Sequence, residues 1–353
     1  MSTDDILFDV RGQVAVVTLN RPRALNALTL EMIRAFEPRL AAWAGDASVA
    51  AVMVRGAGER AFCAGGDVRT IWHDAQRGGT LAAEFFRAEY RLNRAVKVFP
   101  KPYIAVIDGI AMGGGVGVSA HGSHRVVTER TQIAMPETGI GLFPDVGTTY
   151  LLPRLPGALG PYLGLTGARL GPADALYAGL ATHFVASGTL PALEDALAAT
   201  TWPGVKDRDL AGAVLSRFAA DPGPAPLAER RAAIDRCFAQ DSVEAILAAL
   251  HAEKCDWARA TAAGLEERSP TSLKITLEAL RRGATLTFDD AMTMEYRLSQ
   301  ACAARHDFLE GVRAALIDKD NAPRWQPDRL GSVTPELVAA HFHALGANDL
   351  IFD

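Results

Sequence analysis

A run of closely spaced glycines after a strand-like segment is the feature that most constrains this chain. The apolar segment 103–107 predicts a strand, and Asp108-Gly109 leads from it into the stretch 110–117, which contains Gly113-Gly114-Gly115. Glycines let a backbone approach a ligand closely, and the helix predicted to start at Val116 leaves amide N–H groups unpaired at its beginning. The stretch therefore predicts an oxyanion-binding turn.

Two carboxylates follow this turn within about thirty residues: Glu137 in Met135-Pro136-Glu137-Thr138 and Asp145 in Phe143-Pro144-Asp145-Val146-Gly147. Each has an ordinary structural explanation, because Glu137 suits the first turn of a helix and Asp145 suits a β-turn. Combined with an oxyanion turn, the pair indicates acyl-transfer chemistry.

A second glycine turn, Gly65-Gly66, ends the segment 61–67 and follows a predicted strand at 49–54. An oxyanion hole needs two N–H donors aimed at one developing negative oxygen. Either glycine turn alone is explained equally well as a tight turn. The two together supply the donors that acyl transfer needs.

The segment 81–99 predicts an amphipathic helix whose apolar stripe includes Phe85, Leu92 and Val96. Glu89 falls on this stripe, so its side chain is expected to turn inward. It could lie at the edge of the stripe or pair with an arginine. A buried carboxylate otherwise needs a hydrogen-bond partner, and a substrate hydroxyl would supply one.

Composition sets the class of partner and compartment. The net charge of -5 and the pI near 5.9 argue against nucleic acid or an anionic membrane as the main partner. The four cysteines lack Cys-x-x-Cys spacing, and the acidic N-terminus lacks the features of a secretion signal or an Arg-rich transit peptide. No segment suits a membrane span, so a cytoplasmic protein is expected.

The periodicity predicts an α/β fold. Short strands at 14–19, 49–54, 103–107, 125–128 and 132–134 alternate with helices, including one capped by Thr29 that Pro38 should kink or split. Beyond about Leu190 the pattern is helical, interrupted by a Pro-rich loop at 221–226. We therefore expect a core at 1–200 that holds the active site and a helical C-terminal extension at 201–353 packed on it.

These motifs together resemble the crotonase (enoyl-CoA hydratase/isomerase) superfamily. The likeness covers nearly the whole chain, and the segments that carry it are 20–28, 61–68, 85–90, 113–117, 135–147, 269–274 and 294–300. It implies a crotonase-type spiral of ββα repeats with a helical C-terminal region. It also implies a CoA thioester as substrate, with no separate cofactor and no metal, and a homo-oligomer is compatible with it.

The resemblance assigns roles to particular residues. It places the thioester carbonyl between the N–H groups of Gly66 and Gly114. It makes Glu137 and Asp145 catalytic and in contact with the substrate, with Glu137 as general base or nucleophile, and it pairs Glu89 with a substrate hydroxyl. The residues that it places along CoA are Arg23, Ala24, Leu25 and Ala64.

One departure separates this chain from the hydratases of the superfamily. Their first catalytic glutamate would fall at position 117, where this chain has glycine, which cannot do acid–base work. The resemblance is greatest to the thioester hydrolases of the superfamily. It implies conversion of 3-hydroxyisobutyryl-CoA to 3-hydroxyisobutyrate and CoA, a step of valine catabolism, with 3-hydroxypropionyl-CoA as a second substrate.

Three alternatives stay open at this stage. One is enoyl-CoA hydratase or isomerase activity, and another is a non-catalytic CoA-binding protein. The third is a dinucleotide-binding redox domain, because Gly115, Gly117 and Ala120 fit G-x-G-x-x-A and Glu137 follows about 20 residues later. Against it, the glycines do not follow their strand directly, as that fingerprint requires.

Overall fold

The chain alternates between two structural units along its length. The computed structural model describes residues 4–202 and 207–352. The first unit consists of Met1–Gly66, Arg91–Ala134 and Arg169–Ala228, and the second consists of Asp67–Tyr90, Met135–Ala168 and Glu229–Asp353. The division predicted at residue 200 was based on composition along the sequence, and it stays a prediction. The two units described here each consist of three segments that alternate along the chain.

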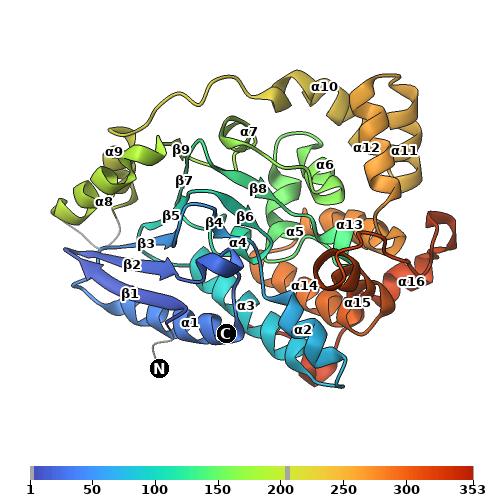
Figure 1. Cartoon of the computed structure of the whole chain (residues 1–353), viewed down its shortest axis with the longest axis horizontal. Coiled ribbons are helices and arrows are strands. Elements are labelled where there is room, and N and C mark those ends of the chain that lie inside the picture. Colours follow the sequence, from blue (N-terminus) through green and yellow to red (C-terminus); the bar gives the residue numbers. More distant parts are fainter. Residues whose placement is uncertain (1–3, 203–206, 353) are drawn as a thin grey trace. The chain divides into compact units, whose positions relative to one another are not determined.

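Two sheets form the centre of the first unit. The larger has the order β1-β2-β3-β5-β7-β9, with β1 and β2 antiparallel and the remaining neighbours parallel (Figure 1). The smaller has the parallel order β4-β6-β8. The strands are β1 (Ile6–Arg11), β2 (Val14–Leu19), β3 (Ala51–Gly56), β4 (Ala61–Cys63), β5 (Tyr103–Ile107), β6 (Ile110–Met112), β7 (His124–Val127), β8 (Gln132–Ala134) and β9 (His183–Phe184).

A repeated pattern links the two sheets. Each of β3, β5 and β7 in the larger sheet is followed after a short connection by β4, β6 or β8 in the smaller one, and then by helix. This is the expected ββα repeat. Because β4 and β6 are parallel neighbours, their carboxyl ends lie at one edge of the smaller sheet.

Two helices of the first unit, α8 and α9, pack on the larger sheet. Apolar residues of α8 and α9, such as Leu193 and Val214, form one core cluster with Val16, Met53 and Ile104 of the strands. The helical elements of this unit are η1 (Pro22–Ala24), α1 (Leu30–Gly45), α4 (Gly114–Gly117), α7 (Pro172–Tyr177), η4 (Ser187–Thr189), α8 (Leu190–Ala199) and α9 (Arg208–Ser216).

The second unit is built from helices and turns. α3 (Leu81–Lys97) and α10 (Pro226–Phe238) each contribute residues to both units. The other elements are α2 (Val68–Ala75), η2 (Glu137–Ile140), α5 (Thr148–Leu151), η3 (Leu152–Arg154), α6 (Leu159–Thr166), α11 (Val243–Ala252), α12 (Asp256–Glu266), α13 (Pro270–Gly283), α14 (Phe288–Ala303), α15 (His306–Val312), η5 (Arg313–Ile317), η6 (Leu330–Ser332), α16 (Pro335–Ala340) and η7 (Gly346–Asn348).

The predicted strands at 14–19, 103–107 and 132–134 coincide with β2, β5 and β8. The cap is also confirmed, since the side chain of Thr29 accepts a hydrogen bond from the N–H of Met32. Pro38 was expected to kink or split this helix, and the split is wrong. Pro38 lies inside an unbroken α1, whose apolar face is buried along its length and outweighs the one hydrogen bond lost to proline.

Lys101 links the end of α1 to the segment before β3 through hydrogen bonds. Its side chain is buried, and Nζ donates to the carbonyl oxygens of Trp43, Asp46 and Val49 at 2.5, 2.6 and 2.6 Å. Carbonyls at a helix C-terminus lack partners within the helix, and a cation is favoured there. The ammonium group therefore satisfies three backbone acceptors in one place.

We expect Lys101→Met to lower the free energy of unfolding by about 2–4 kcal/mol, because buried carbonyls lose a charged donor. Urea denaturation followed by circular dichroism measures this loss. Lys97→Met, at an exposed position of α3, is the matched control. A loss below about 0.5 kcal/mol, which is ordinary for surface substitutions, would contradict the role given to Lys101.

Candidate active site

The two predicted donor turns lie side by side in the first unit. They follow β4 and β6, and a Cβ added to Gly65 would lie 4.0 Å from the Gly114 nitrogen. Within the part of the chain that the structure describes, the N–H groups of Gly66 and Gly114 donate no hydrogen bond. Two unpaired amides at one sheet edge are what an oxyanion site requires.

Glycine is needed here for steric reasons. A Cβ at Gly115 would lie 2.1 Å from the carbonyl oxygen of Cys63, so the two turns could not approach each other with a larger residue. Gly113 has φ 48° and ψ −121°, a conformation that side chains disfavour. The helix predicted to start at Val116 begins two residues earlier, since α4 spans Gly114–Gly117.

The predicted CoA-contacting residues meet the second turn within the same unit. The N–H of Ala64 donates to the carbonyl of Leu25 at 3.0 Å, which places η1 next to the 61–66 segment. Asn26 is fully buried and donates to the carbonyls of Ala57 and Ala61. Arg23 and Ala24 are exposed, so they are available to a ligand.

The three predicted carboxylates belong to the second unit. Glu89 lies on α3, Glu137 begins η2, and Asp145 lies in the turn before α5. All three are buried, and the expectation that Glu89 turns inward is confirmed. Among the described residues, Oε1 of Glu89 and Oε2 of Glu137 have no hydrogen-bond partner. Buried polar atoms without partners are rare and mark places where a ligand or water completes the site.

Tight backbone packing fixes Glu137. The N–H of Ser269, at the start of α13, donates to the carbonyl of Thr138 at 3.2 Å. α15 packs on η2 so closely that a Cβ at Gly311 would lie 2.4 Å from the carbonyl carbon of Ile140. The short helix that presents Glu137 is therefore held on both sides by longer helices.

Burial controls the protonation of these groups. It raises the pKa of Asp145 to about 7, although the hydrogen bond from Tyr90 opposes the rise. Burial also raises the pKa of Glu137 well above its ordinary range, and the charge of Asp145 adds to this, whereas Arg268 opposes it. The pKa of Glu89 is raised by burial and then by its acidic neighbours. The cluster therefore holds protons near neutral pH.

Two residues that join this cluster were missed by the site prediction. The hydroxyl of Tyr90 donates to Oδ2 of Asp145 at 2.8 Å. Glu295, on α14, is fully buried, and burial raises its pKa to about 8. Both lie in segments that carried the family resemblance, 85–90 and 294–300. The resemblance was the only feature of the sequence that could have identified Tyr90 and Glu295, because the residues that they contact are distant in sequence.

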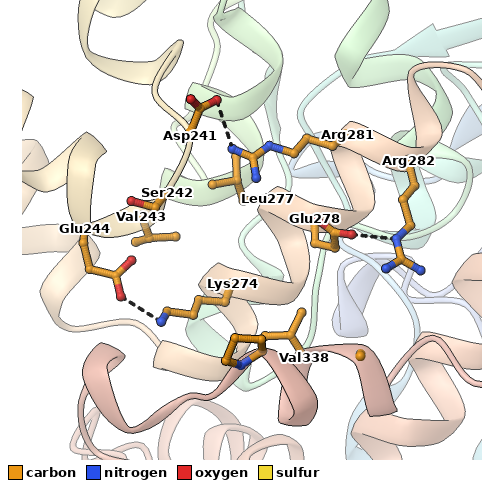
Figure 2. Close-up of a pocket in the computed structure, with 12 residues that line it drawn as sticks. Asp241, Ser242, Val243, Glu244, Lys274, Leu277, Glu278, Arg281, Arg282 and Val338 are labelled. Carbon is orange, nitrogen blue, oxygen red and sulfur yellow. Dashed lines mark hydrogen bonds and ion pairs between the residues drawn. The ribbon is translucent and has the colours of Figure 1, made fainter.

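Two cavities lie away from the predicted site residues. In the second unit a cavity of about 290 Å³ is lined by α11, α13 and α16, and Lys274, Arg281 and Arg282 there pair with acidic residues (Figure 2). In the first unit a cavity of about 410 Å³ lies near Arg55 and Arg130. None of the predicted site residues lines either cavity.

The comparison with known proteins decides the family. Residues 14–342 match the family described as Enoyl-CoA hydratase/isomerase. The chain belongs to this enoyl-CoA hydratase/isomerase family. The match covers most of both units and agrees with the crotonase resemblance and with the ββα repeats of the fold.

Family members similar to this chain carry names of different activities. The proteins named 3-hydroxyisobutyryl-CoA hydrolase, mitochondrial, from Gallus gallus and Homo sapiens are 48% and 47% identical, over 99% of this chain and 91% and 92% of theirs. A solved carnitinyl-CoA dehydratase from Mycobacterium thermoresistibile has a TM-score of 0.93 at 45% identity, covering 99% of each chain. A solved enoyl-CoA hydratase from Rhodobacter sphaeroides has a TM-score of 0.91 at 40% identity, covering 99% of this chain and 100% of its own.

The described residues contain neither a candidate metal site nor a candidate membrane-spanning helix. Among residues 4–202 and 207–352, no group of three or more His, Cys, Asp or Glu side chains could hold a metal ion. Over the same residues, no helix is both long and apolar enough to cross a membrane.

The carboxyl cluster predicts an unusual pH dependence of stability. The pKa values of Asp145 and Glu295 are raised in the folded chain to about 7 and about 8 and return to ordinary values on unfolding. The folded chain therefore holds more protons, so the stabilisation is complete below the ordinary pKa and is lost as pH rises through the raised values. The free energy of unfolding should fall between about pH 5 and about pH 8, by about 1.4 kcal/mol per pH unit for each extra proton held.

Urea titrations across this range measure the slope. Glu89→Gln removes one proton-holding group and should make the fall less steep, whereas Glu229→Gln, at an exposed position of α10, should leave it unchanged. A wild-type stability that rises steadily with pH would contradict the protonation given to the cluster.

Proposed function

We propose that this chain hydrolyses short-chain 3-hydroxyacyl-CoA thioesters, with 3-hydroxyisobutyryl-CoA as the main substrate and 3-hydroxypropionyl-CoA as a second one. The observation that carries the proposal is the buried Glu137 with an unpartnered Oε2, in a chain with glycine at position 117. One reactive carboxylate suits attack at a carbonyl carbon, whereas addition of water across a double bond in this family uses two glutamates. The names of the vertebrate relatives support the same reaction.

In the proposed mechanism the N–H groups of Gly66 and Gly114 donate to the thioester oxygen and stabilise the negative charge that it gains. Glu137 either removes a proton from the attacking water or attacks the carbonyl itself to give a mixed anhydride that water opens. The C–S bond breaks, and the CoA sulfur leaves as a thiolate that takes up a proton. The net reaction adds one water and yields a carboxylic acid and a thiol.

The remaining carboxyl groups act on the acyl part and on protons. Asp145 moves a proton or binds the 3-hydroxyl group, and its pKa near 7 allows both forms at neutral pH. Oε1 of Glu89, which lacks a partner, accepts a hydrogen bond from that hydroxyl group. A substrate without the hydroxyl leaves this atom unsatisfied, which gives a physical reason for selecting hydroxyacyl groups.

We expect Glu137→Gln to lower kcat by about 10²–10⁴-fold with a small change in KM, because the amide can neither accept a proton nor attack. Thiol release from 3-hydroxyisobutyryl-CoA measures this. Glu278→Gln, in a surface ion pair with Arg282 on α13, is the control. A Glu137→Gln protein with nearly unimpaired turnover would remove Glu137 from the mechanism.

Single turnover in oxygen-18 water separates the two roles of Glu137. If a mixed anhydride forms and water opens it at the Glu137 carboxyl carbon, the label appears in the Glu137 side chain. If Glu137 is a general base, or if water opens the anhydride at the acyl carbon, the label appears in the product acid, so label in Glu137 identifies the anhydride. Mass spectrometry of the peptide that contains residue 137 reads the result.

Enoyl-CoA hydration is the second candidate, because solved structures with hydratase and dehydratase names are 40–45% identical to this chain. A panel of hydroxyacyl- and enoyl-CoA thioesters distinguishes the two. Free thiol from the hydroxyacyl substrates supports hydrolysis. Loss of enoyl absorbance without free thiol supports hydration.

We further propose that the reaction serves valine catabolism and that the acyl-CoA substrate is the main partner. The cytoplasmic location stays a prediction, because the relatives compared above carry the word mitochondrial in their names. Fractionation of the native cell with antibody detection tests the compartment.

A further inference from the structure

The turn that carries Asp145 has a backbone that needs support from outside. Val146 has φ 55° and Gly147 has φ 84°, so two consecutive residues are left-handed. The first of them is β-branched, a residue type for which this conformation is unusual. Such a turn persists only where surrounding contacts determine it.

Glu295 supplies these contacts. Its Oε2 accepts from the N–H of Gly147 at 2.7 Å, and its Oε1 accepts from the N–H and Oγ1 of Thr149 at 3.0 and 2.6 Å. Both carboxylate oxygens are thus used by the turn, and the side chain is fully buried. An amide in its place would present an NH₂ group to one of these donors.

The side chain of Asp145 is fixed by a second contact. Tyr90 donates to it from α3, and the Tyr90 ring packs edge-on against Tyr296 at 6.4 Å. Arg87 in turn donates to the Tyr296 hydroxyl at 2.9 Å and lies over its ring. The neighbours Glu295 and Tyr296 on α14 therefore support the backbone of the turn and the residue that binds its side chain.

We infer that Glu295 is a positioning residue that holds the main chain of the 145–149 turn and thereby sets the Tyr90–Asp145 hydrogen bond. It contacts no reacting atom in this scheme and acts through Asp145. The importance of Glu295 for catalysis rests on the proposed function. Its support of the turn does not, because the hydrogen bonds that show it all lie within the second unit.

The titratable groups around Asp145 make its titration a sensitive readout. The titratable groups that interact with it are Glu89, Tyr90, Glu137, Glu295 and Cys302. The hydrogen bond from Tyr90 favours the ionised form and lowers the pKa of Asp145. Loosening the turn weakens this bond, so the pKa of Asp145 should rise.

The experiment follows the Asp145 carboxyl carbon by NMR in protein labelled with carbon-13 aspartate, with Asp145→Asn used for assignment. We expect Tyr90→Phe and Glu295→Gln each to raise the pKa of Asp145 by about 0.5 units or more. The double variant should shift it no further than the larger single variant, because both substitutions weaken the same bond. Glu278→Gln, on the surface of α13, should leave the titration unchanged.

The kinetic counterpart is a pH profile of thiol release. Glu295→Gln should move the Asp145-dependent limb of kcat/KM in the same direction as the NMR titration and lower kcat more than it changes KM. A Glu295→Gln protein with the wild-type Asp145 titration, beside a shifted Tyr90→Phe protein, overturns the inference.

Two further results keep the test decisive. If Glu295→Gln does not fold, Thr149→Val removes one of the three donors and should give a smaller shift in the same direction, and no shift there overturns the inference. A wild-type protein that releases no thiol from any hydroxyacyl-CoA overturns the proposed function alone, because the Asp145 titration is read without substrate.

Discussion

The removal of acidic side chains from water is the constraint on which the second unit depends. Glu89, Glu137, Asp145 and Glu295 are all buried, and each would be costly there as a bare charge. Hydrogen bonds offset this cost for two of the four: Glu295 accepts three, and Asp145 accepts one from Tyr90. Glu89 and Glu137 each have one oxygen without a partner among the described residues. The unsatisfied oxygens are therefore the atoms of this cluster that still lack a hydrogen-bond donor.

The first unit depends on a different constraint, the closeness of two backbone turns. The parallel pairing of β4 and β6 brings their ends together, and glycine at position 115 allows contact with the carbonyl of Cys63. The free amides of Gly66 and Gly114 result from this packing. No side chain has to move to create them, which is the property that makes an oxyanion site effective.

The sequence predicted what local patterns encode. Strong β-rich runs gave three strands with correct bounds, and helical periodicity identified Glu89 as buried. The short strands β4 and β6 were missed because the segments 61–67 and 110–117 were interpreted as glycine turns, and β1 was missed because half of it faces solvent. Tyr90 and Glu295 escaped the site prediction because their partners lie 55 and about 150 residues away, and no local pattern reports such contacts.

The hydrogen bonds from the Asp145 turn to Glu295 determine which parts of this turn a substitution affects. Two of its three hydrogen bonds come from main-chain amides, which every residue except proline provides. The side chains at positions 146 and 148 donate none of these bonds, and both are fully buried, so a substitution there changes the packing beside Asp145 without removing a donor to Glu295. The architecture separates the acid on α14, which holds the main chain of the turn, from the buried side chains of the loop, which determine the packing beside Asp145.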